Sequence, residues 1–245
     1  MLVAIHQPNF LPRPKVLDKI LSADLTIWLD NVQYVRREWQ NRALVRDSSG
    51  EHHWLSVPVL NRGHWAQESI AECHVQASDR WRHRHLATVR RFYAKSPWIG
   101  EFDQKVADLW TPQPALLASF AMESSERIAD LLGRRIESVL ASDLTASGHR
   151  TDRLITLCQA VGASAYLTGT GALSYLDFDA FEKADIRLLV QADVDTPESP
   201  DVAWRRLSSL DAILTLGPQK FKELYLKGLH YERSDVGDRQ SEVRV

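Results

Sequence analysis

Polar side chains follow the first two apolar runs of the chain, at the points where those runs end. His6 and Gln7 come directly after Leu2–Ile5, and Asp30 closes the run Leu25–Leu29. An imidazole near a carboxylate suits general acid–base chemistry, metal binding or hydrogen bonding to a ribose or an amine. Both residues also have a structural interpretation, since a loop carbonyl satisfies a histidine and an aspartate often caps a turn.

A cluster of arginines, amides and one indole follows the second run. Arg36, Arg37 and Arg42 surround the segment 39–41, which reads Trp-Gln-Asn. Guanidinium groups match pairs of phosphate or carboxylate oxygens, and an indole offers a stacking face for a base, a sugar or an arginine. The mixture suits a nucleotide-linked substrate, and the alternative is a solvated surface with one structural ion pair.

A glycine-containing segment, Thr168–Gly171, lies between a predicted strand and a predicted helix. Backbone amides of such a loop, with the helix N-terminus, can face an anion. The segment lacks the third glycine of the dinucleotide fingerprint, and the chain contains no Gly-Lys-Ser/Thr phosphate loop. A tight structural turn and a binding loop are therefore both open interpretations.

The histidines and cysteines show no spacing typical of a metal site or a covalent nucleophile. His52 and His53 are adjacent on a predicted strand, whereas His85 lies on a predicted helix, and neither arrangement is a zinc motif. Cys73 and Cys158 stand far apart without a CxxC pair, which indicates two buried thiols in a reducing compartment. We predict no metal ligands.

The apolar pattern predicts an α/β fold that positions these residues. Leu2–Ile5 has no polar residue on either face, as in a strand buried in a parallel sheet. Helical spacing over Lys15–Ser22 and the apolar run Leu25–Leu29 complete a strand–loop–helix–strand unit. Because ligands of open α/β sheets bind beyond the carboxyl ends of the strands, we expect His6 and Asp30 at one rim.

Further elements are predicted along the rest of the chain. Turn residues 47–50 between two β-prone runs predict a hairpin over 43–59, and a turn is expected at 61–64. Strands are predicted over 70–75, 136–140, 165–167 and 185–191. Helices are predicted over 79–96, 102–110, 115–132, 151–161, from the glycine loop through 181, and over 209–216 and 219–225, with an irregular segment at 193–200.

The predicted class is α/β, with an open, mostly parallel sheet flanked by helices, a β-hairpin insertion and a largely helical central segment. We expect a single domain over 1–231 and a polar C-terminal tail over 232–245. The net charge of -2 over 245 residues argues against a DNA-coating protein or a polybasic membrane binder. Without a signal peptide or a long apolar run, the expected location is cytoplasmic, with no membrane partner.

Several motifs share a pattern with a known family. They are the opening run Ile5–Pro12, then Lys19, Ala23-Asp24, Leu29-Asp30, Val32–Tyr34, Arg37 and Trp39–Arg42, continuing at Trp54-Leu55, Val57–Val59, Trp81, His85, Tyr93, Tyr166–Gly169, Tyr175-Leu176, Leu207-Ser208 and Asp211. Together they resemble the WbqC-like family over nearly the whole chain, up to about Tyr225. The chain departs from the family pattern at Arg13–Lys15 and at Glu198–Pro200.

Members of that family resemble bacterial cytoplasmic proteins encoded with surface-polysaccharide, O-antigen or secondary-metabolite genes, and are often described as transferases. With the polar rim, this implies an acyl or aminoacyl transferase, or an amide-forming ligase, acting on an amine of a nucleotide-linked sugar or small metabolite. The alternatives are a non-catalytic nucleotide-sugar-binding module and a tRNA-dependent aminoacyl transfer protein. ATP with Mg²⁺ is a candidate cofactor pair, tRNA is a candidate donor, and the sequence leaves the oligomeric state open.

The predicted site residues fall into two groups. For catalysis they are His6, Asp30 and Gln33, with His6 taking a proton from the attacking amine and Asp30 orienting His6 or holding that amine. For substrate binding they are Gln7, Asn9, Tyr34, Arg36, Arg37, Trp39, Gln40, Asn41, Arg42, His85, Thr168, Gly169 and Thr170.

Overall fold

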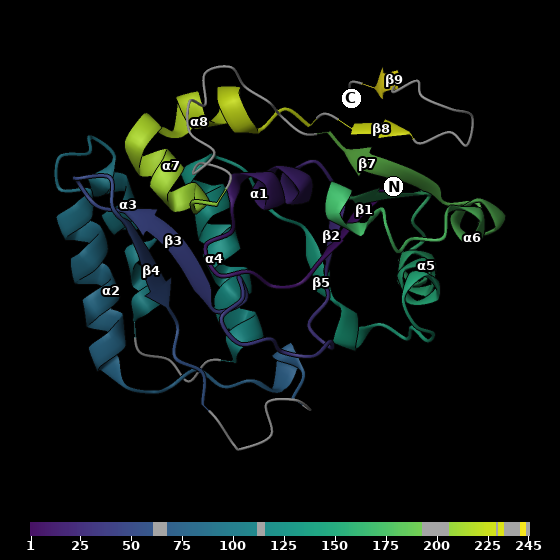
Figure 1. Cartoon of the computed structure of the whole chain (residues 1–245), viewed down its shortest axis with the longest axis horizontal. Helices are drawn as coiled ribbons and strands as arrows, with labels where there is room; N and C mark the ends of the chain where they lie inside the picture. The colour runs from purple at the N-terminus through teal and green to yellow at the C-terminus, as the bar shows by residue number, and fades with distance from the viewer. Residues whose placement is uncertain (61–67, 112–115, 193–205, 229, 233–240, 244–245) are drawn as a thin grey trace.

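The computed structural model describes residues 1–60, 68–111, 116–192, 206–228, 230–232 and 241–243. The turn predicted at 61–64 and the irregular segment at 193–200 lie outside these residues. Figure 1 shows a parallel sheet on one side of the molecule, and a hairpin with several helices on the other.

The main sheet contains the predicted parallel strands. In spatial order these are β5 (Ser138–Leu140), β2 (Leu25–Trp28), β1 (Leu2–His6), β6 (Ala165–Thr168) and β7 (Arg187–Gln191). Antiparallel strands β8 (His230–Glu232) and β9 (Ser241–Val243) extend the sheet beyond β7, so one strand forms where the sequence predicts a polar tail. The predicted α/β class with a mostly parallel sheet is confirmed.

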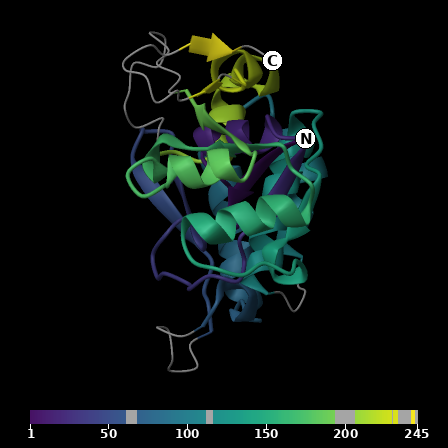
Figure 2. The same cartoon turned by 90° about the vertical axis from the view of Figure 1, so that its right-hand side faces the viewer.

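Helices cover both faces of this sheet. On one face, α5 (Thr151–Ala160) and α6 (Phe178–Lys183) pack against the side chains of Val3, Ile5 and Ile27; both helices lie in front of the sheet in Figure 2. On the other face, α1 (Pro14–Leu21) packs on Trp28 and contacts α4 (Leu117–Leu131). Burial of both strand faces explains the absence of polar alternation in β1.

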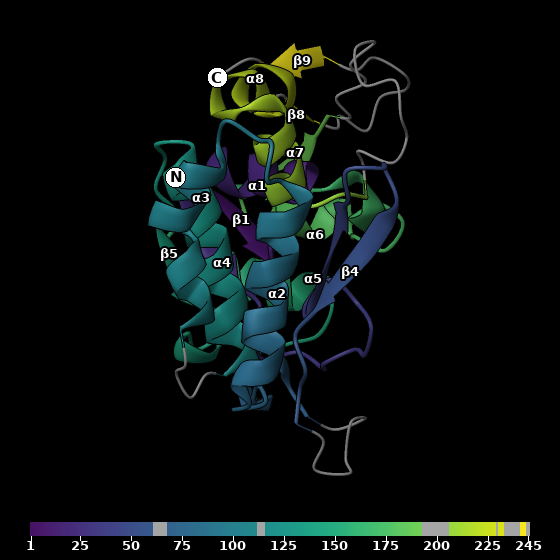
Figure 3. The ribbon, with the colours of Figure 1, turned by 90° about the vertical axis from the view of Figure 1, so that its left-hand side faces the viewer.

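The second part of the molecule is built on the antiparallel hairpin of β3 (Arg42–Arg46) and β4 (His52–Ser56), which confirms the predicted insertion. Figure 3 shows the hairpin beside the helices of the central segment. These elements share one apolar core with α1 and α4. The helices concerned are α2 (Asp79–Phe92), α3 (Ile99–Lys105), α7 (Ser209–Leu216) and α8 (Pro218–Tyr225), with the 3₁₀ turn η2 (Ala107–Trp110).

Two local predictions are wrong, for identifiable reasons. In place of the strand predicted over 70–75 there is a 3₁₀ turn, η1 (Ile70–Glu72), because Ser69 and Glu72 form a reciprocal capping box, and His74 and Val75 form isolated β-bridges. The helix predicted directly after the glycine loop is a single 3₁₀ turn, η4 (Thr170–Ala172), and α6 starts only after the cap Asp177. The anion-binding argument from a helix N-terminus therefore does not apply to this loop.

The strand order reverses at β1, and this reversal determines where a ligand site is expected. From β1 the chain adds β2 and then β5 on one side, whereas β6 and then β7 lie on the other side. In open α/β sheets the crevice beyond the carboxyl ends at such a reversal is the usual ligand site. The residues that leave β1 and β6 there are His6 and Thr168.

Candidate functional site

The loop that follows β1 is held by hydrogen bonds from two directions. The amide of Phe10 donates to the carbonyl of Trp39 at 3.0 Å, and the amide of Leu11 donates to Ser124 Oγ on α4 at 2.8 Å. Leu11 has a φ of 44°, a left-handed conformation that costs free energy in a residue with a branched side chain. A loop fixed in this way holds the adjacent His6 and Asn9 in place before any ligand arrives.

The imidazole of His6 faces a buried amine from the following helix. Lys19 Nζ lies 3.1 Å from His6 Nδ1 and donates to the carbonyl of Ile5, also at 3.1 Å. Lys19 is buried because α1 lies between the sheet and the helices α4, α7 and α8. The end of β1 therefore presents an imidazole whose inner nitrogen is bound by an ammonium group.

Burial and charge lower the proton affinity of both groups. The pKa of His6 lies well below its usual value, first because the ring is desolvated and then because Lys19 is cationic, while Asn9 opposes part of this shift. Desolvation, with a smaller contribution from Lys15, lowers the pKa of Lys19 to about 8. At neutral pH His6 is therefore a neutral imidazole and Lys19 is an ammonium.

The ammonium determines the tautomer of His6. An ammonium can only donate, so His6 Nδ1 must accept from Lys19 and the proton of the neutral ring is on Nε2. Once Lys19 loses its proton, the amine can accept instead, and the proton can move to Nδ1. His6 Nε2 is then free to act as a base.

The carboxylate predicted as the partner of His6 makes other hydrogen bonds. Asp30 is buried, and its two oxygens accept from the amide of Ser142 at 3.0 Å and from Ser142 Oγ at 2.6 Å. Ser142 lies in the 3₁₀ turn η3 (Ala141–Asp143) that follows β5. Asp30 thus joins the ends of β2 and β5. The side chain that contacts the ring of His6 is Lys19 and not the predicted Asp30.

The amide residues predicted for the site link the β1 loop to the segment after β2. Gln40 Nε2 donates to Gln7 Oε1 at 2.8 Å, and Gln40 Oε1 accepts from the amide of Val35 at 3.0 Å. Asn9 Nδ2 donates to the carbonyl of Gln7, and Asn41 Nδ2 donates to the carbonyl of Val57. These contacts bring Gln7, Asn9 and Gln40 together beside His6.

The other predicted residues of this segment are spread over the surface and the core. Gln33 is exposed and pairs with Ser69 in an isolated β-bridge, whereas Tyr34 is buried in the core. Arg36 and Arg37 are exposed, and Arg37 has a φ of 59°. The structure thus places Tyr34 in the core, and Gln33, Arg36 and Arg37 on the surface of the segment after β2.

The β6 loop reaches the site through a second lysine. Lys15 Nζ donates to Thr170 Oγ1 at 3.0 Å, which connects α1 to the glycine loop across the strand-order reversal. Thr168 is buried at the end of β6, and Gly169 is half-buried. Because β1 and β6 are parallel neighbours, the predicted residues Thr168–Thr170 and His6 lie at the same carboxyl edge of the sheet.

His85 lies in the aromatic core. Its Nδ1 accepts from Trp110 Nε1 at 3.2 Å, and its ring packs with Phe10 and Trp81. Burial is the main reason that the pKa of His85 is lowered to about 4, with a hydrogen bond to the backbone of Ser56 opposing it. These contacts are those of a buried structural histidine, and its predicted role in substrate binding has no contact in support.

Lys19 and Lys15 are absent from the predicted site residues, although Lys19 is among the residues that carry the family resemblance and the two lysines contact His6 and Thr170. The apolar spacing of α1 is carried by Val16, Leu17 and Ile20, and it places Lys19 beside this stripe on the solvent side. Nearly the whole surface of α1 is nevertheless buried in the fold, including Asp18 and Lys19. No sequence pattern within the helix indicates this burial, because it comes from elements distant in the chain.

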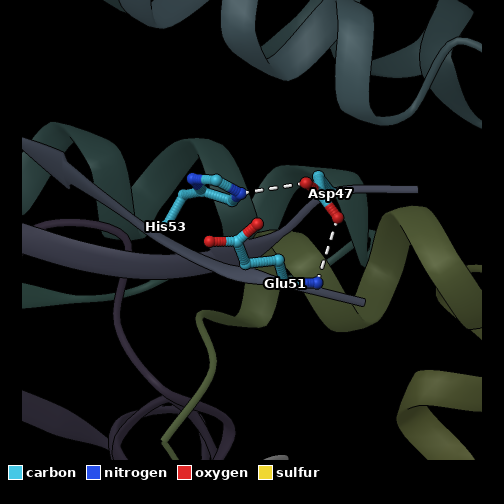
Figure 4. A group of neighbouring side chains, drawn as sticks. All are labelled: Asp47, Glu51 and His53. Carbon is cyan, nitrogen blue, oxygen red and sulfur yellow. Dashed lines mark hydrogen bonds and ion pairs between the residues drawn. The ribbon is translucent and has the colours of Figure 1, made fainter. Parts of the chain in front are cut away.

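A separate group of possible metal ligands lies at the tip of the β3–β4 hairpin (Figure 4). Asp47, Glu51 and His53 offer ligand atoms within 4.8 Å of one another. Asp47 already accepts from the amides of Ser49 and Glu51, from Ser49 Oγ and from His53 Nε2. These bonds close the turn, so the geometry of the group is explained by the hairpin itself.

The fold and the rim together define an α/β protein whose parallel sheet reverses its strand order at β1, with His6 and Thr168 at the strand ends there. Comparison with known proteins identifies it further: the sequence profile of the WbqC-like protein family matches residues 7–223. The chain belongs to this family. It is also 30% identical over 198 residues to the uncharacterized protein Rv1507c of Mycobacterium tuberculosis, covering 76% of this chain and 80% of that protein. No solved structure matches significantly.

Within the described residues, none of the helices has the length and apolar character needed to pass through a lipid bilayer.

Proposed function

We propose that this protein transfers an acyl or aminoacyl group to an amine of a nucleotide-linked sugar or small metabolite, in the biosynthesis of a surface polysaccharide or a secondary metabolite. The observation that carries the proposal is the contact between His6 and the buried Lys19 at the strand-order reversal. The imidazole can take a proton from the attacking amine through Nε2 once Lys19 is a neutral amine and the ring proton is on Nδ1.

The chemistry balances with one proton transfer. The amine nitrogen of the acceptor attacks the carbonyl carbon of an activated acyl donor, so a C–N bond forms and the bond from that carbon to the leaving group breaks. His6 Nε2 takes the proton that the attacking nitrogen loses. The resulting imidazolium is stabilised when Lys19 is a neutral amine that accepts from His6 Nδ1, and destabilised when Lys19 is an ammonium.

Cations near the rim give this site an affinity for charged substrates. Lys15 lies on α1 with Lys19, and Arg13 is the residue directly before this helix. Arg42 is the first residue of β3. A phosphate on the acceptor, or on an acyl phosphate or adenylate formed with ATP, would be attracted by these groups. Positioning of the two reactants would supply much of the rate.

The role of Lys19 predicts a pH profile. If His6 is the base, kcat/KM should rise with pH and level off at an apparent pKa near 8, because the base form needs a neutral Lys19. If His6 instead serves as an N–H donor from Nε2, the rate should fall over the same range.

The experiment is a mass-spectrometric screen for acylated product. Nucleotide-linked amino sugars would be offered with acyl-CoA, with acyl phosphates, or with a carboxylic acid plus ATP and Mg²⁺. His6→Ala and His6→Gln should lose at least 100-fold in kcat while keeping the circular dichroism spectrum of the wild type. Turnover that is unchanged in both variants would contradict the proposal.

The alternative function is a non-catalytic nucleotide-sugar-binding module, which the exposed indole of Trp54 and the half-buried Arg42 next to it support. Calorimetry and product analysis on the same samples separate the two functions. Binding of a nucleotide-linked sugar without conversion by any of the donors would favour the module.

A further inference from the structure

Four side chains next to the β1 loop form a stack in which two indoles lie between two guanidinium groups. The Arg13 guanidinium carbon lies 4.4 Å from the ring centroid of Trp39, and the ring centroids of Trp39 and Trp54 are 5.3 Å apart. The Arg42 guanidinium carbon lies 4.0 Å from the ring centroid of Trp54. We refer to these four residues as the arginine–tryptophan ladder.

Three separate segments build the ladder. Trp54 on β4 lies opposite Leu44 on β3, so it shares a face of the hairpin with Arg42, which is two residues from Leu44. Trp39 is held by the hydrogen bond from Phe10 to its carbonyl. Arg13 is the residue directly before α1, so the helix that supplies Lys19 also fixes one end of the ladder.

The ladder has more positive charge than its surroundings compensate. Arg206 lies close enough to lower the pKa of Arg13, after desolvation as the larger cause, while Glu38 acts in the opposite direction. Nε of Arg13 and Nε of Arg42 are buried and have no hydrogen-bond acceptor among the described residues. Unsatisfied guanidinium donors beside a second cation favour an anionic ligand.

The indoles add a preference for a planar ring. Trp54 is 38% exposed, although it is a large aromatic residue on a hairpin strand. The 38% of Trp54 that stays exposed beside Trp39 and Arg42 offers aromatic contact area to a nucleobase, and a guanidinium group next to it can bind the attached phosphate. A ligand that satisfies both features carries an aromatic ring and a phosphate within the same molecule.

We propose that the arginine–tryptophan ladder binds the phosphorylated nucleoside of the substrate, with the base against Trp54 and phosphate oxygens on Arg13 and Arg42. The inference rests on the proposed function to the extent that this nucleoside belongs to the acylated substrate. The hydrogen bond from Gln40 to Gln7 joins the residue after Trp39 to the residue after His6. A nucleotide bound at the ladder would thus extend toward the imidazole.

The chain contains a matched control for this arrangement. Arg91 lies over Phe92 on α2, with its guanidinium carbon 5.1 Å from the ring centroid, and it is exposed. This pair has the same cation–aromatic geometry, but within the described residues it has no second indole stacked on it. Arg91→Gln removes a surface arginine of similar kind without changing the ladder.

The test is titration calorimetry of the full chain with ADP and UDP at low salt. Trp54→Leu and Arg42→Gln should each weaken binding about tenfold or more, whereas Trp54→Phe should keep most of the affinity because a ring remains. Arg91→Gln should bind like the wild type. Thermal unfolding of each variant shows whether lost binding reflects lost structure, and Arg13→Gln provides a change outside the hairpin.

Three results would overturn the proposal: no binding of either nucleotide, equally tight binding of inorganic pyrophosphate, or equally tight binding of unphosphorylated adenosine and uridine. Unchanged affinity in both Trp54→Leu and Arg42→Gln would do the same. His6→Ala should bind ADP and UDP as the wild type does. Failure of the proposed chemistry would therefore leave the nucleotide titration unaffected, and failure of the ladder would appear in the titration alone.

Discussion

A half-buried arginine, Arg46, and a buried lysine, Lys19, have opposite surroundings in this protein. Arg46 at the end of β3 is neutralised, since Asp211 on α7 accepts from its Nη2 at 3.0 Å, from its Nε at 3.3 Å and from its backbone amide at 2.8 Å. Tyr93 donates to the same carboxylate. Lys19 contacts a carbonyl and an imidazole, and it has no ion pair with an acidic residue of the described part of the chain.

The difference separates a structural site from a functional one. A buried ion pair with its remaining hydrogen bonds satisfied joins the elements that carry it, here the hairpin, α2 and α7. A buried ammonium without a carboxylate is destabilising, because desolvation is not offset by an opposite charge. A protein that keeps such a group at the end of a central strand gains something other than stability from it.

The largest expected effect comes from removing the carboxylate of the neutralised site. Asp211→Ala leaves Arg46 and the Tyr93 hydroxyl without their partner and should lower the free energy of unfolding by about 3–5 kcal/mol. Urea unfolding followed by circular dichroism measures this change. The matched control is Asp103→Ala, which removes the partner of Arg90 in an exposed ion pair and should cost roughly 0–1 kcal/mol. Equal losses in the two variants would remove the distinction drawn between the sites.

The second effect concerns the dependence of stability on pH at Lys19. Its pKa in the folded protein, about 8, is below the unfolded value, so between about pH 8 and 10.5 the unfolded chain binds more protons and stability rises with pH. Over this pH interval the free energy of unfolding of the wild type should increase by roughly 1–3 kcal/mol relative to that of Lys19→Met.

The comparison with Lys19→Met is needed because tyrosines also titrate in this range. Unfolding free energies of both proteins would be measured at pH 7, 8, 9 and 10. A difference between them that stays constant with pH would mean that Lys19 is an ordinary solvated amine in the folded protein.

The smallest effect tests the hydrogen bonds of Asp30. Ser142→Ala removes the hydroxyl that donates to Asp30 Oδ2 but leaves the amide bond to Oδ1, so the expected loss of stability is about 1–1.5 kcal/mol. Acyl transfer per folded molecule should be unchanged if Asp30 mainly joins β2 to β5. A 100-fold loss of kcat at unchanged stability would instead place Asp30 in the chemistry.

Local pattern predicts most of the architecture and part of the rim. Apolar spacing and turn residues determine β1, α1, β2 and the β3–β4 hairpin, and the carboxyl ends of the strands bring His6 close to Gln7 and Thr168. Tertiary packing determines the remainder. The burial of Lys19 depends on α4, α7 and α8, and the partner of Asp30 arrives from η3, more than a hundred residues away.

Sequence also gives no sign of how aromatic residues divide between core and surface. Trp54 and Trp110 both lie in mixed segments of the chain, yet Trp110 is 2% exposed and bonded to His85, whereas Trp54 is exposed on the hairpin. The hairpin face that Trp54 shares with Arg42 becomes visible only from the strand register.

The most direct test of the central claim is a ¹⁵N NMR titration of histidine-labelled protein, with His6→Gln used to assign the His6 resonances. At pH 7 the imidazole should be neutral, with the proton on Nε2 and Nδ1 accepting from Lys19. Its shifts should change with a midpoint near pH 8, and Lys19→Met should abolish that change. An imidazolium at pH 7, or a titration that Lys19→Met leaves unaltered, would contradict a coupled His6–Lys19 pair.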